Sequence, residues 1–288
     1  THSDSSAASD VYKRQMRMQT VFSGPELCRK QAHEVIALLK SGDISPKDCL
    51  DAAFTRIADV EPAINAMPTL CPERAYAAAE SRASPGDDRA AWLAGLPLAI
   101  KDLNMVAGVR TTFGTKGFSD FVPDSSDLLV TRLEARGGVV VGKTNTPEMG
   151  AGGNTFNDVF GPTLNPWDTK LNAGGSSGGA AASLATGEVW LSHGSDHGGS
   201  LRTPASFCGI VGLRPSPGRV PSSGPSGFAT EGVQGPMARS VRDCALFLDA
   251  MSGFTPAVPV SYPWPVEGTF EAAVIEACLL YTSPSPRD

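Results

Sequence analysis

The sequence predicts an α/β domain built on a buried, partly parallel β-sheet. Three observations support this class of fold. Short apolar runs rich in β-branched residues alternate with segments of helical periodicity, 41% of the residues are hydrophobic, and Gly and Ser concentrate between residues 150 and 227, where loops are expected. A hydrophobic core of ordinary size is therefore expected, and disordered and fibrous classes are excluded.

The N-terminal part of the chain is predicted to be helical. Pro25 suits the first turn of a helix whose apolar positions continue with helical spacing as far as Leu39. A second helix is expected to begin at Pro46, with Ser45 as its N-cap. An alanine-rich segment at residues 75–81 predicts a third helix.

Strands and helices alternate along the rest of the chain. Strands are expected at residues 93–100, 138–141 and 189–191. Helices are expected at residues 128–136, 180–185 and 241–251, and loops at residues 108–126 and 150–173.

Composition limits the classes of function. The chain has 24 Lys and Arg against 30 Asp and Glu, a net charge of −6 without a basic patch, so no nucleic-acid partner is expected. No apolar run approaches the ~20 residues of a membrane-spanning helix, so no membrane partner is expected. The cysteines lack the spacing of a zinc site or a disulfide framework, which favours a reducing cytoplasm as the location and predicts no metal.

Both ends of the chain are expected to be non-native. Residues 10–15 and 278–282 can be translated from one DNA element read in opposite orientations, and they resemble transposase-type sequencing-library adapters. We therefore assign residues 1–15 and 278–288 to adapters and exclude them from the prediction of the fold. Residues 16–277 are expected to form a single domain that is truncated at its C-terminus.

Two short motifs suggest other functions. GGVVVGKT at residues 137–144 fits a phosphate-binding loop, but its three valines favour a strand, which argues against nucleotide binding. GGSSG at residues 174–178 fits the nucleophile elbow of a Ser–His hydrolase, with Ser176 as nucleophile and His193 or His197 as base. The elbow needs an apolar strand before the serine, and the preceding sequence does not provide one.

The most informative segment is residues 174–214, where two Gly- and Ser-rich loops are separated by one helix and one strand. The second loop, DHGGS at residues 196–200, can turn its backbone amides inward as an anion-binding nest, because glycine adopts the φ angles required. A hydroxyl beside such a nest has the arrangement of a serine nucleophile beside its oxyanion hole. Composition alone is explained equally well by a flexible Gly/Ser linker.

These motifs resemble the amidase signature family. GGSSGG at 174–179, GSDHGGSLRTPA at 194–205 and FCGIVGLRP at 207–215 follow in the family's order, and GLPLAIKD at 95–102 resembles the strand that carries its catalytic lysine. The resemblance covers approximately residues 27–251. It implies a mixed, partly parallel sheet flanked by helices on both sides, and chemistry without a metal or cofactor.

The resemblance also implies a set of site residues. Ser200 would be the acyl nucleophile, Ser176, which follows a cis peptide bond in the family, would relay the proton, and Lys101 would be the base. The oxyanion hole would be formed by the backbone amides of His197, Gly198, Gly199 and Ser200. The supporting residues would be Asp196, Arg202 and Ser177.

A lysine base must be neutral, so the pKa of Lys101 has to fall from about 10.4 toward 7–8. Burial beside the apolar strand at residues 96–100 is the expected physical cause. A carboxylate at Asp102 would oppose this shift if it lay close to the amine. Because neighbouring side chains alternate along a strand, we expect Asp102 to point to the other face of the sheet.

The sequence therefore predicts an amidase that cleaves a linear carboxamide through an acyl-Ser200 intermediate and releases ammonia or an amine. Its expected partner is a small-molecule amide, and a homodimer is left open. The alternatives are the A subunit of a tRNA-dependent amidotransferase, the Ser–His hydrolase described above, and a non-catalytic protein on the same fold. Loss of Lys101, Ser176 or Ser200 would indicate the last of these, and all three are present.

Overall fold

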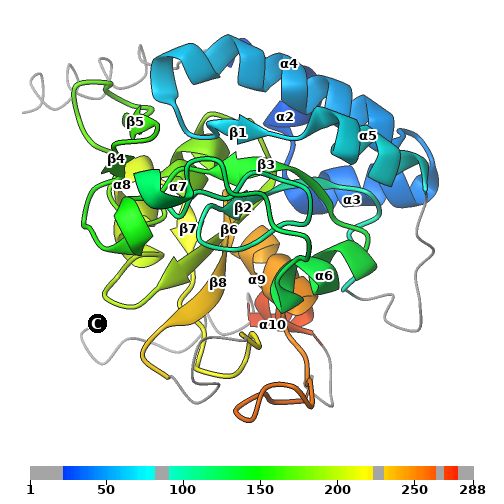
Figure 1. Ribbon diagram of the computed structural model, residues 1–288. Helices are drawn as coiled ribbons and strands as arrows, with labels where there is room; N and C mark the ends of the chain where they lie inside the picture. Colours follow the sequence, from blue (N-terminus) through cyan, green and yellow to red (C-terminus); the bar gives the residue numbers. More distant parts are fainter. Residues whose placement is uncertain (1–21, 82–90, 223–229, 264–268, 278–288) are drawn as a thin grey trace, which may run out of the picture.

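The computed structural model describes residues 22–81, 91–222, 230–263 and 269–277, and the terminal segments expected to be non-native lie outside these ranges. Its centre is a six-stranded sheet with the strand order β1-β3-β2-β6-β8-β7 (Figure 1). The strands are β1 (Thr69–Leu70), β2 (Pro97–Lys101), β3 (Val139–Thr144), β6 (Leu191–Asp196), β7 (Val211–Gly212) and β8 (Val233–Ala238). β2 pairs in parallel with β3 and β6, and the other pairs are antiparallel, so the sheet is mixed, as predicted.

Helices cover both faces of this sheet. The helices are α2 (Glu26–Arg29), α3 (Ala32–Ser41), α4 (Pro46–Ile64), α5 (Pro72–Glu80), α6 (Leu128–Ala135), α7 (Gly178–Ala185), α8 (Arg202–Cys208), α9 (Val241–Met251) and α10 (Phe270–Ala277). The apolar residues of α3, α6 and α9 form one buried cluster, and those of α5, α7 and α8 form a second. Leu98 and Ile100 of β2 belong to the first cluster and Ala99 to the second, as alternation along a strand requires.

The remaining elements are short. They are two 3-10 turns, η2 (Lys116–Phe118) and η3 (Glu148–Gly150), and a two-stranded hairpin of β4 (Phe156–Asn157) and β5 (Gly161–Pro162). In Figure 1, α4 and α5 lie across the top of the view, and α9 and α10 lie in its lower half, beside β8.

The helices agree closely with the sequence pattern. The Ser45 hydroxyl accepts a hydrogen bond from the Asp48 amide and caps α4, as expected for Ser-Pro at a helix start. The segment after Pro25, in contrast, forms two helices rather than one. Gln31 separates α2 from α3 because it forms a capping box with Glu34, which starts a new helix at Ala32.

The strands agree less well with the sequence pattern: β2 begins at Pro97 rather than at residue 93, and the two-residue strands β1, β4, β5 and β7 are not predicted. The largest differences concern β6 and β8. The strand predicted at residues 189–191 begins only at Leu191 and continues through five small or polar residues to Asp196. β8 was not predicted at all, because Gly235 and Pro236 interrupt its apolar pattern. β6 can be buried despite its polarity, because β2 and β8 satisfy its backbone from both sides.

The parallel strands determine where a functional site can form. β2, β3 and β6 run in the same direction, so their carboxyl ends lie at one edge of the sheet. β2 ends at Lys101, β3 at Thr144 and β6 at Asp196. The side chains and loops that follow these strands therefore converge there, as in other α/β proteins.

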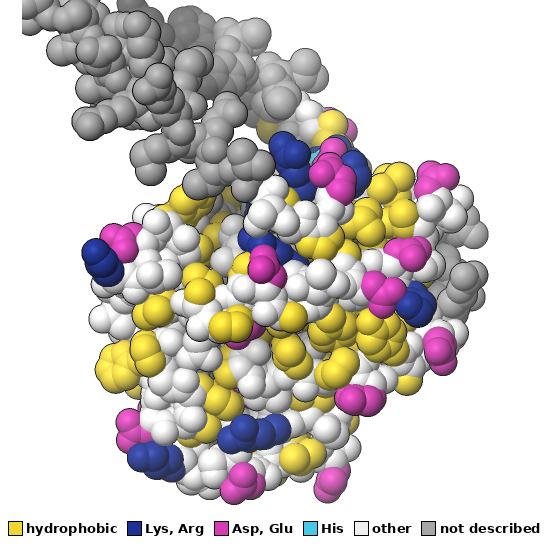
Figure 2. Space-filling model, turned by 90° about the horizontal axis from the view of Figure 1, so that it is seen from above, with side chains coloured by type: hydrophobic (Ala, Val, Ile, Leu, Met, Phe, Trp, Pro, Cys, Tyr) yellow, Lys and Arg dark blue, Asp and Glu magenta, His cyan; other side chains and the backbone are white. Residues whose placement is uncertain are grey.

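The described surface carries no broad basic area on the face formed by α4 and α5. Figure 2 shows Lys and Arg on this face interspersed with Asp and Glu and with hydrophobic side chains. None of the helices in the described ranges has the length and apolarity needed to cross a bilayer. The thiols of Cys28, Cys49, Cys71, Cys208 and Cys244 are free and buried; the cytoplasmic location stays a prediction.

Gly179, at the start of α7, provides a test of this packing. A Cβ at Gly179 would lie 2.4 Å from the Asn145 nitrogen and 2.6 Å from the Ala66 oxygen, both of which are backbone atoms. We expect Gly179→Ala to lower the free energy of unfolding by about 1–3 kcal/mol, measured by chemical denaturation. Gly153→Ala is the matched control, because a Cβ there meets nothing within 4 Å; equal effects of the two substitutions would contradict the packing.

Candidate active site

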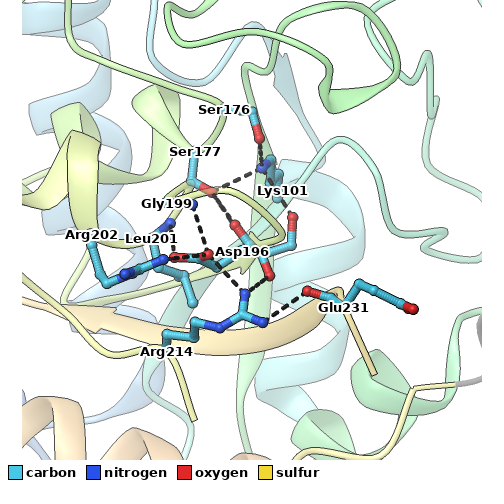
Figure 3. A network of polar contacts seen from close by, with 10 residues as sticks. Lys101, Ser176, Ser177, Asp196, Gly199, Leu201, Arg202, Arg214 and Glu231 are labelled. Atoms are coloured by element: carbon cyan, nitrogen blue, oxygen red, sulfur yellow. Dashed lines mark hydrogen bonds and ion pairs between the residues drawn. The ribbon is translucent and has the colours of Figure 1, made fainter. Parts of the chain in front are cut away.

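A buried lysine stands at the centre of the site. Lys101 ends β2 with 0% of its surface exposed. Its Nζ lies 2.7 Å from the Ser176 Oγ, 2.9 Å from the Ser177 Oγ and 3.1 Å from the Ser195 Oγ. Figure 3 shows the hydroxyls of Ser176 and Ser177 directed toward this amine. The structure thus brings the predicted base and the predicted proton relay into hydrogen-bond contact.

The surroundings of Lys101 favour its neutral form. Burial lowers the pKa of Lys101 to about 7, against an opposing effect of the Asp196 carboxylate. The adjacent Asp102 is engaged elsewhere, because its Oδ1 lies 2.7 Å from the Nζ of Lys143. Lys143 is paired with Ile100 in the sheet and so lies on the face opposite Lys101. Asp102 therefore points away from Lys101, as expected.

The loop that carries Ser176 is held at both ends by one hydroxyl. The Oγ1 of Thr155 donates to the Gly174 carbonyl at 2.9 Å and accepts from the Gly178 amide at 3.0 Å. Between these two contacts lies the cis peptide bond that joins Gly175 to Ser176. Thr155 is 2% exposed and was not identified from the sequence. Its position in a long loop, remote in sequence from the serines, gave no signal of this role.

The second loop is organised by a buried carboxylate at the end of β6. Asp196 accepts hydrogen bonds from the Gly199 and Leu201 amides at 2.9 and 3.1 Å, and from Arg202 and Arg214 at 3.0 and 2.9 Å. Burial raises the pKa of Asp196, but the hydrogen bonds from Arg202, Gly199, Leu201 and Arg214 outweigh this and hold it well below the usual range. Arg202 and Arg214 converge on this carboxylate in Figure 3.

Asp196 thereby fixes the turn that presents the predicted nucleophile. Ser200 is half-buried and lies between the two residues whose amides bind the carboxylate. Gly199 has a φ of +112°, a conformation that favours glycine. Arg214, which also binds the Asp196 carbonyl, was missed as a site residue, although the sequence FCGIVGLRP already contained it.

One of the four amides predicted to form the oxyanion hole already has a hydrogen-bond acceptor in the structure. The Gly199 amide is engaged by Asp196, so it is a brace of the loop rather than a free donor. Among the described residues, the amides of His197, Gly198 and Ser200 have no hydrogen-bond acceptor. Within the same ranges, no hydrogen bond joins the Ser200 hydroxyl to Ser176 or Lys101. The structure therefore places Ser200 on the fixed loop without joining it to the lysine–serine pair.

The histidines do not form a Ser–His pair with Ser176. His193 is buried, its Nε2 lies 2.6 Å from the Gln234 Oε1, and its Nδ1 accepts the Lys101 amide at 3.4 Å. Burial lowers the pKa of His193 to about 3, so the ring is neutral. His197 is exposed on the loop. The Ser176 hydroxyl is instead bonded to Lys101, which removes the basis of the Ser–His hypothesis.

Two other chemistries find no site here. The segment predicted to be a poor phosphate-binding loop is strand β3, and its lysine, Lys143, is buried in an ion pair. A phosphate could not reach that amine. In the part of the chain that the structure describes, no three His, Cys, Asp or Glu side chains are grouped to hold a metal ion.

The Thr155 bridge predicts a specific loss on substitution. Thr155→Val leaves the Gly174 carbonyl and the Gly178 amide buried without this partner, so the free energy of unfolding is expected to fall by about 1–3 kcal/mol. Thr155→Ser keeps the hydroxyl and is expected to stay much closer to the parent protein. Thermal and chemical denaturation measure the difference, and equal destabilisation by Val and Ser would show that the hydroxyl is unimportant.

Comparison with known proteins agrees with this geometry. The Amidase family matches residues 48–278. The chain is 42% identical over 238 residues to the A subunit of glutamyl-tRNA(Gln) amidotransferase from Pelobacter propionicus, covering 81% of this chain and 49% of that protein. The chain thus spans about half the length of the curated relatives it matches.

Two solved structures share the fold. One is a 6-aminohexanoate cyclic dimer hydrolase, with a TM-score of 0.75 and 36% identity over 85% of this chain and 50% of the other. The second is a bacterial aryl acylamidase described as an amidase signature enzyme, with a TM-score of 0.77 and 34% identity over 85% of this chain and 51% of the other. With the family match over most of its length and the Lys101–Ser176 contact at the end of β2, this chain belongs to the amidase signature family.

Proposed function

We propose that this chain carries the catalytic core of an amidase that hydrolyses a carboxamide through an acyl-Ser200 intermediate. The observation that carries the proposal is the contact between the buried Lys101 amine and the Ser176 hydroxyl. This amine has no carboxylate among its hydrogen-bond partners, so burial alone favours the neutral form that a base requires.

The proton path follows from these positions. Neutral Lys101 accepts the proton of the Ser176 hydroxyl as Ser176 accepts that of Ser200. The Ser200 oxygen then forms a bond to the amide carbon, and the carbonyl electron pair moves to oxygen as an oxyanion. The oxyanion forms beside Ser200, and its proposed donors are the amides of His197, Gly198 and Ser200 on the same loop. Such donors stabilise a developing charge most in a site shielded from water.

The second half of the reaction reverses the path. The oxyanion collapses, the carbon–nitrogen bond breaks, and the proton stored on Lys101 returns through Ser176 to the departing ammonia or amine. A water molecule then attacks the acyl-Ser200 ester and gives its proton to the same relay. This releases the acid and restores the Ser200 hydroxyl. The hydroxyls of Ser177 and Ser195 keep the lysine amine aimed at the relay.

A linear carboxamide of small size is the substrate class we propose. One of the two similar structures is named an aryl acylamidase and the other a cyclic dimer hydrolase, and the first name supports amide cleavage. The curated relatives favour a second candidate function, in which the chain is one component of an amidotransferase and works with other chains.

Light scattering of the purified chain distinguishes a monomer from a homodimer, which we also propose. Co-purification of the chain with other components would favour the amidotransferase function.

The nucleophile is tested with a fluorophosphonate probe, in which Ser200 displaces fluoride from phosphorus. We expect Ser200→Ala to lose labelling by about 10³-fold or more, and to lose turnover in a screen of amides and anilides. Ser41→Ala, an exposed serine far from the site in sequence, is the matched control. Undiminished labelling or turnover in Ser200→Ala would overturn the assignment.

The pH dependence tests the base. Because the active form of Lys101 is unprotonated and its pKa is about 7, labelling should rise about tenfold per pH unit below 7 and level off above it. The rise is therefore with increasing pH. Lys101→Arg keeps a charge that cannot be removed, so it should be unreactive across the whole range. A flat profile between pH 5 and 8 would contradict a lysine base.

A further inference from the structure

A second buried lysine lies directly across the sheet from the base. Lys143 of β3 is 0% exposed, and its Nζ lies 2.7 Å from the Asp102 Oδ1 and 2.8 Å from the Thr111 Oγ1. The other oxygen of Asp102 accepts from the Thr112 amide at 3.0 Å and from its hydroxyl at 2.6 Å. All four groups are buried, and the proton relay described above uses none of them.

This arrangement matters because Asp102 follows the proposed base in the chain. A carboxylate buried without a cation would favour the charged form of any amine near it. At an effective dielectric constant of about 20, a unit charge about 10 Å away shifts a pKa by about one unit. Lys143 supplies the opposite charge at contact distance, so the pair presents almost no net charge to the other face of the sheet.

We propose that Lys143 is a positioning residue that cancels the charge of Asp102 and so allows the neighbouring Lys101 to remain unprotonated. The inference rests on the proposed function in one respect, namely that Lys101 is the base. The Thr111 and Thr112 hydroxyls complete the coordination of the pair and hold both charges away from the relay. Two buried lysines thus have different partners. Burial lowers the pKa of Lys143, but the Asp102 carboxylate opposes this at contact distance, while the hydrogen-bond partners of Lys101 are hydroxyls.

Other titratable groups around the two lysines are few. Asp196 acts on Lys101 from β6, and His193 lies near both lysines but is held neutral by burial. Asp127 acts on Lys143 and is itself engaged by the Asn104 side chain and the Met105 amide. Cys71 also lies near Lys143, and burial raises the pKa of its thiol to about 11, which keeps it neutral.

The test uses two substitutions with opposite expected signs. Lys143→Met removes the cation and leaves the Asp102 carboxylate, so the apparent pKa of Lys101 should rise. Asp102→Asn removes the negative charge from this side of the sheet, so the same pKa should fall. Each shift should be about half a pH unit or more. The double variant removes both charges and should return close to the parent value.

The readout is the titration of Lys101 itself, by NMR of the chain labelled with ¹³C at the lysine ε-carbon. The Lys101 signal is assigned by its absence in Lys101→Met. A purely structural pair would not shift this titration in opposite directions. Unchanged titration in both single variants, or shifts of the same sign, would overturn the proposal. Should Lys143→Met fail to fold, Asp102→Asn and its reversal in the double variant decide the question.

Fluorophosphonate labelling in parallel separates this inference from the proposed function. If the labelling profile moves with the Lys101 titration in each variant, both are supported. If Ser200 is never labelled but the titration shifts as expected, the proposed function fails and the charge compensation stands. If Ser200 is labelled and the titration does not respond, the charge compensation fails alone.

Discussion

The desolvation of one amine is the constraint on which the rest of this site depends. Lys101 ends a central parallel strand, so the sheet and the helices on both faces exclude water from it. Its hydrogen-bond partners are three serine hydroxyls, which orient the amine without adding a counter-charge. A carboxylate partner would also satisfy the buried amine, but it would favour the protonated form of the lysine. A base must be unprotonated before it can accept a proton.

The backbone around the amine is fixed by other buried polar groups. Asp196 organises the loop of Ser200 by binding two amides and two guanidinium groups, and Thr155 joins the two ends of the loop of Ser176. In both cases one side chain satisfies several groups that would be costly to bury alone. Glycine-rich loops are flexible in isolation, so these contacts convert them into a defined arrangement.

The two buried lysines of the sheet have different hydrogen-bond partners. Lys143 and Lys101 lie on adjacent strands and opposite faces, and only Lys143 has a carboxylate at contact distance. Burial lowers the pKa of both amines, and a carboxylate at contact distance opposes this lowering at Lys143. In the proposed function the Lys101–Ser176 pair is the proton relay, and in the further proposal the pairing of Asp102 with Lys143 sets the electrostatic conditions for it.

The sequence by itself determined the mixed α/β fold, most helices, and the order of the motifs that carry Lys101, Ser176 and Ser200, because local spacing and glycine content encode them. The tertiary structure decided the features that depend on residues distant in the chain. These are the polar strand β6, the engagement of the Gly199 amide by Asp196, and the Thr155 and Lys143 contacts. Their physical basis is the pairing of buried polar groups, which a linear pattern of hydrophobicity does not record.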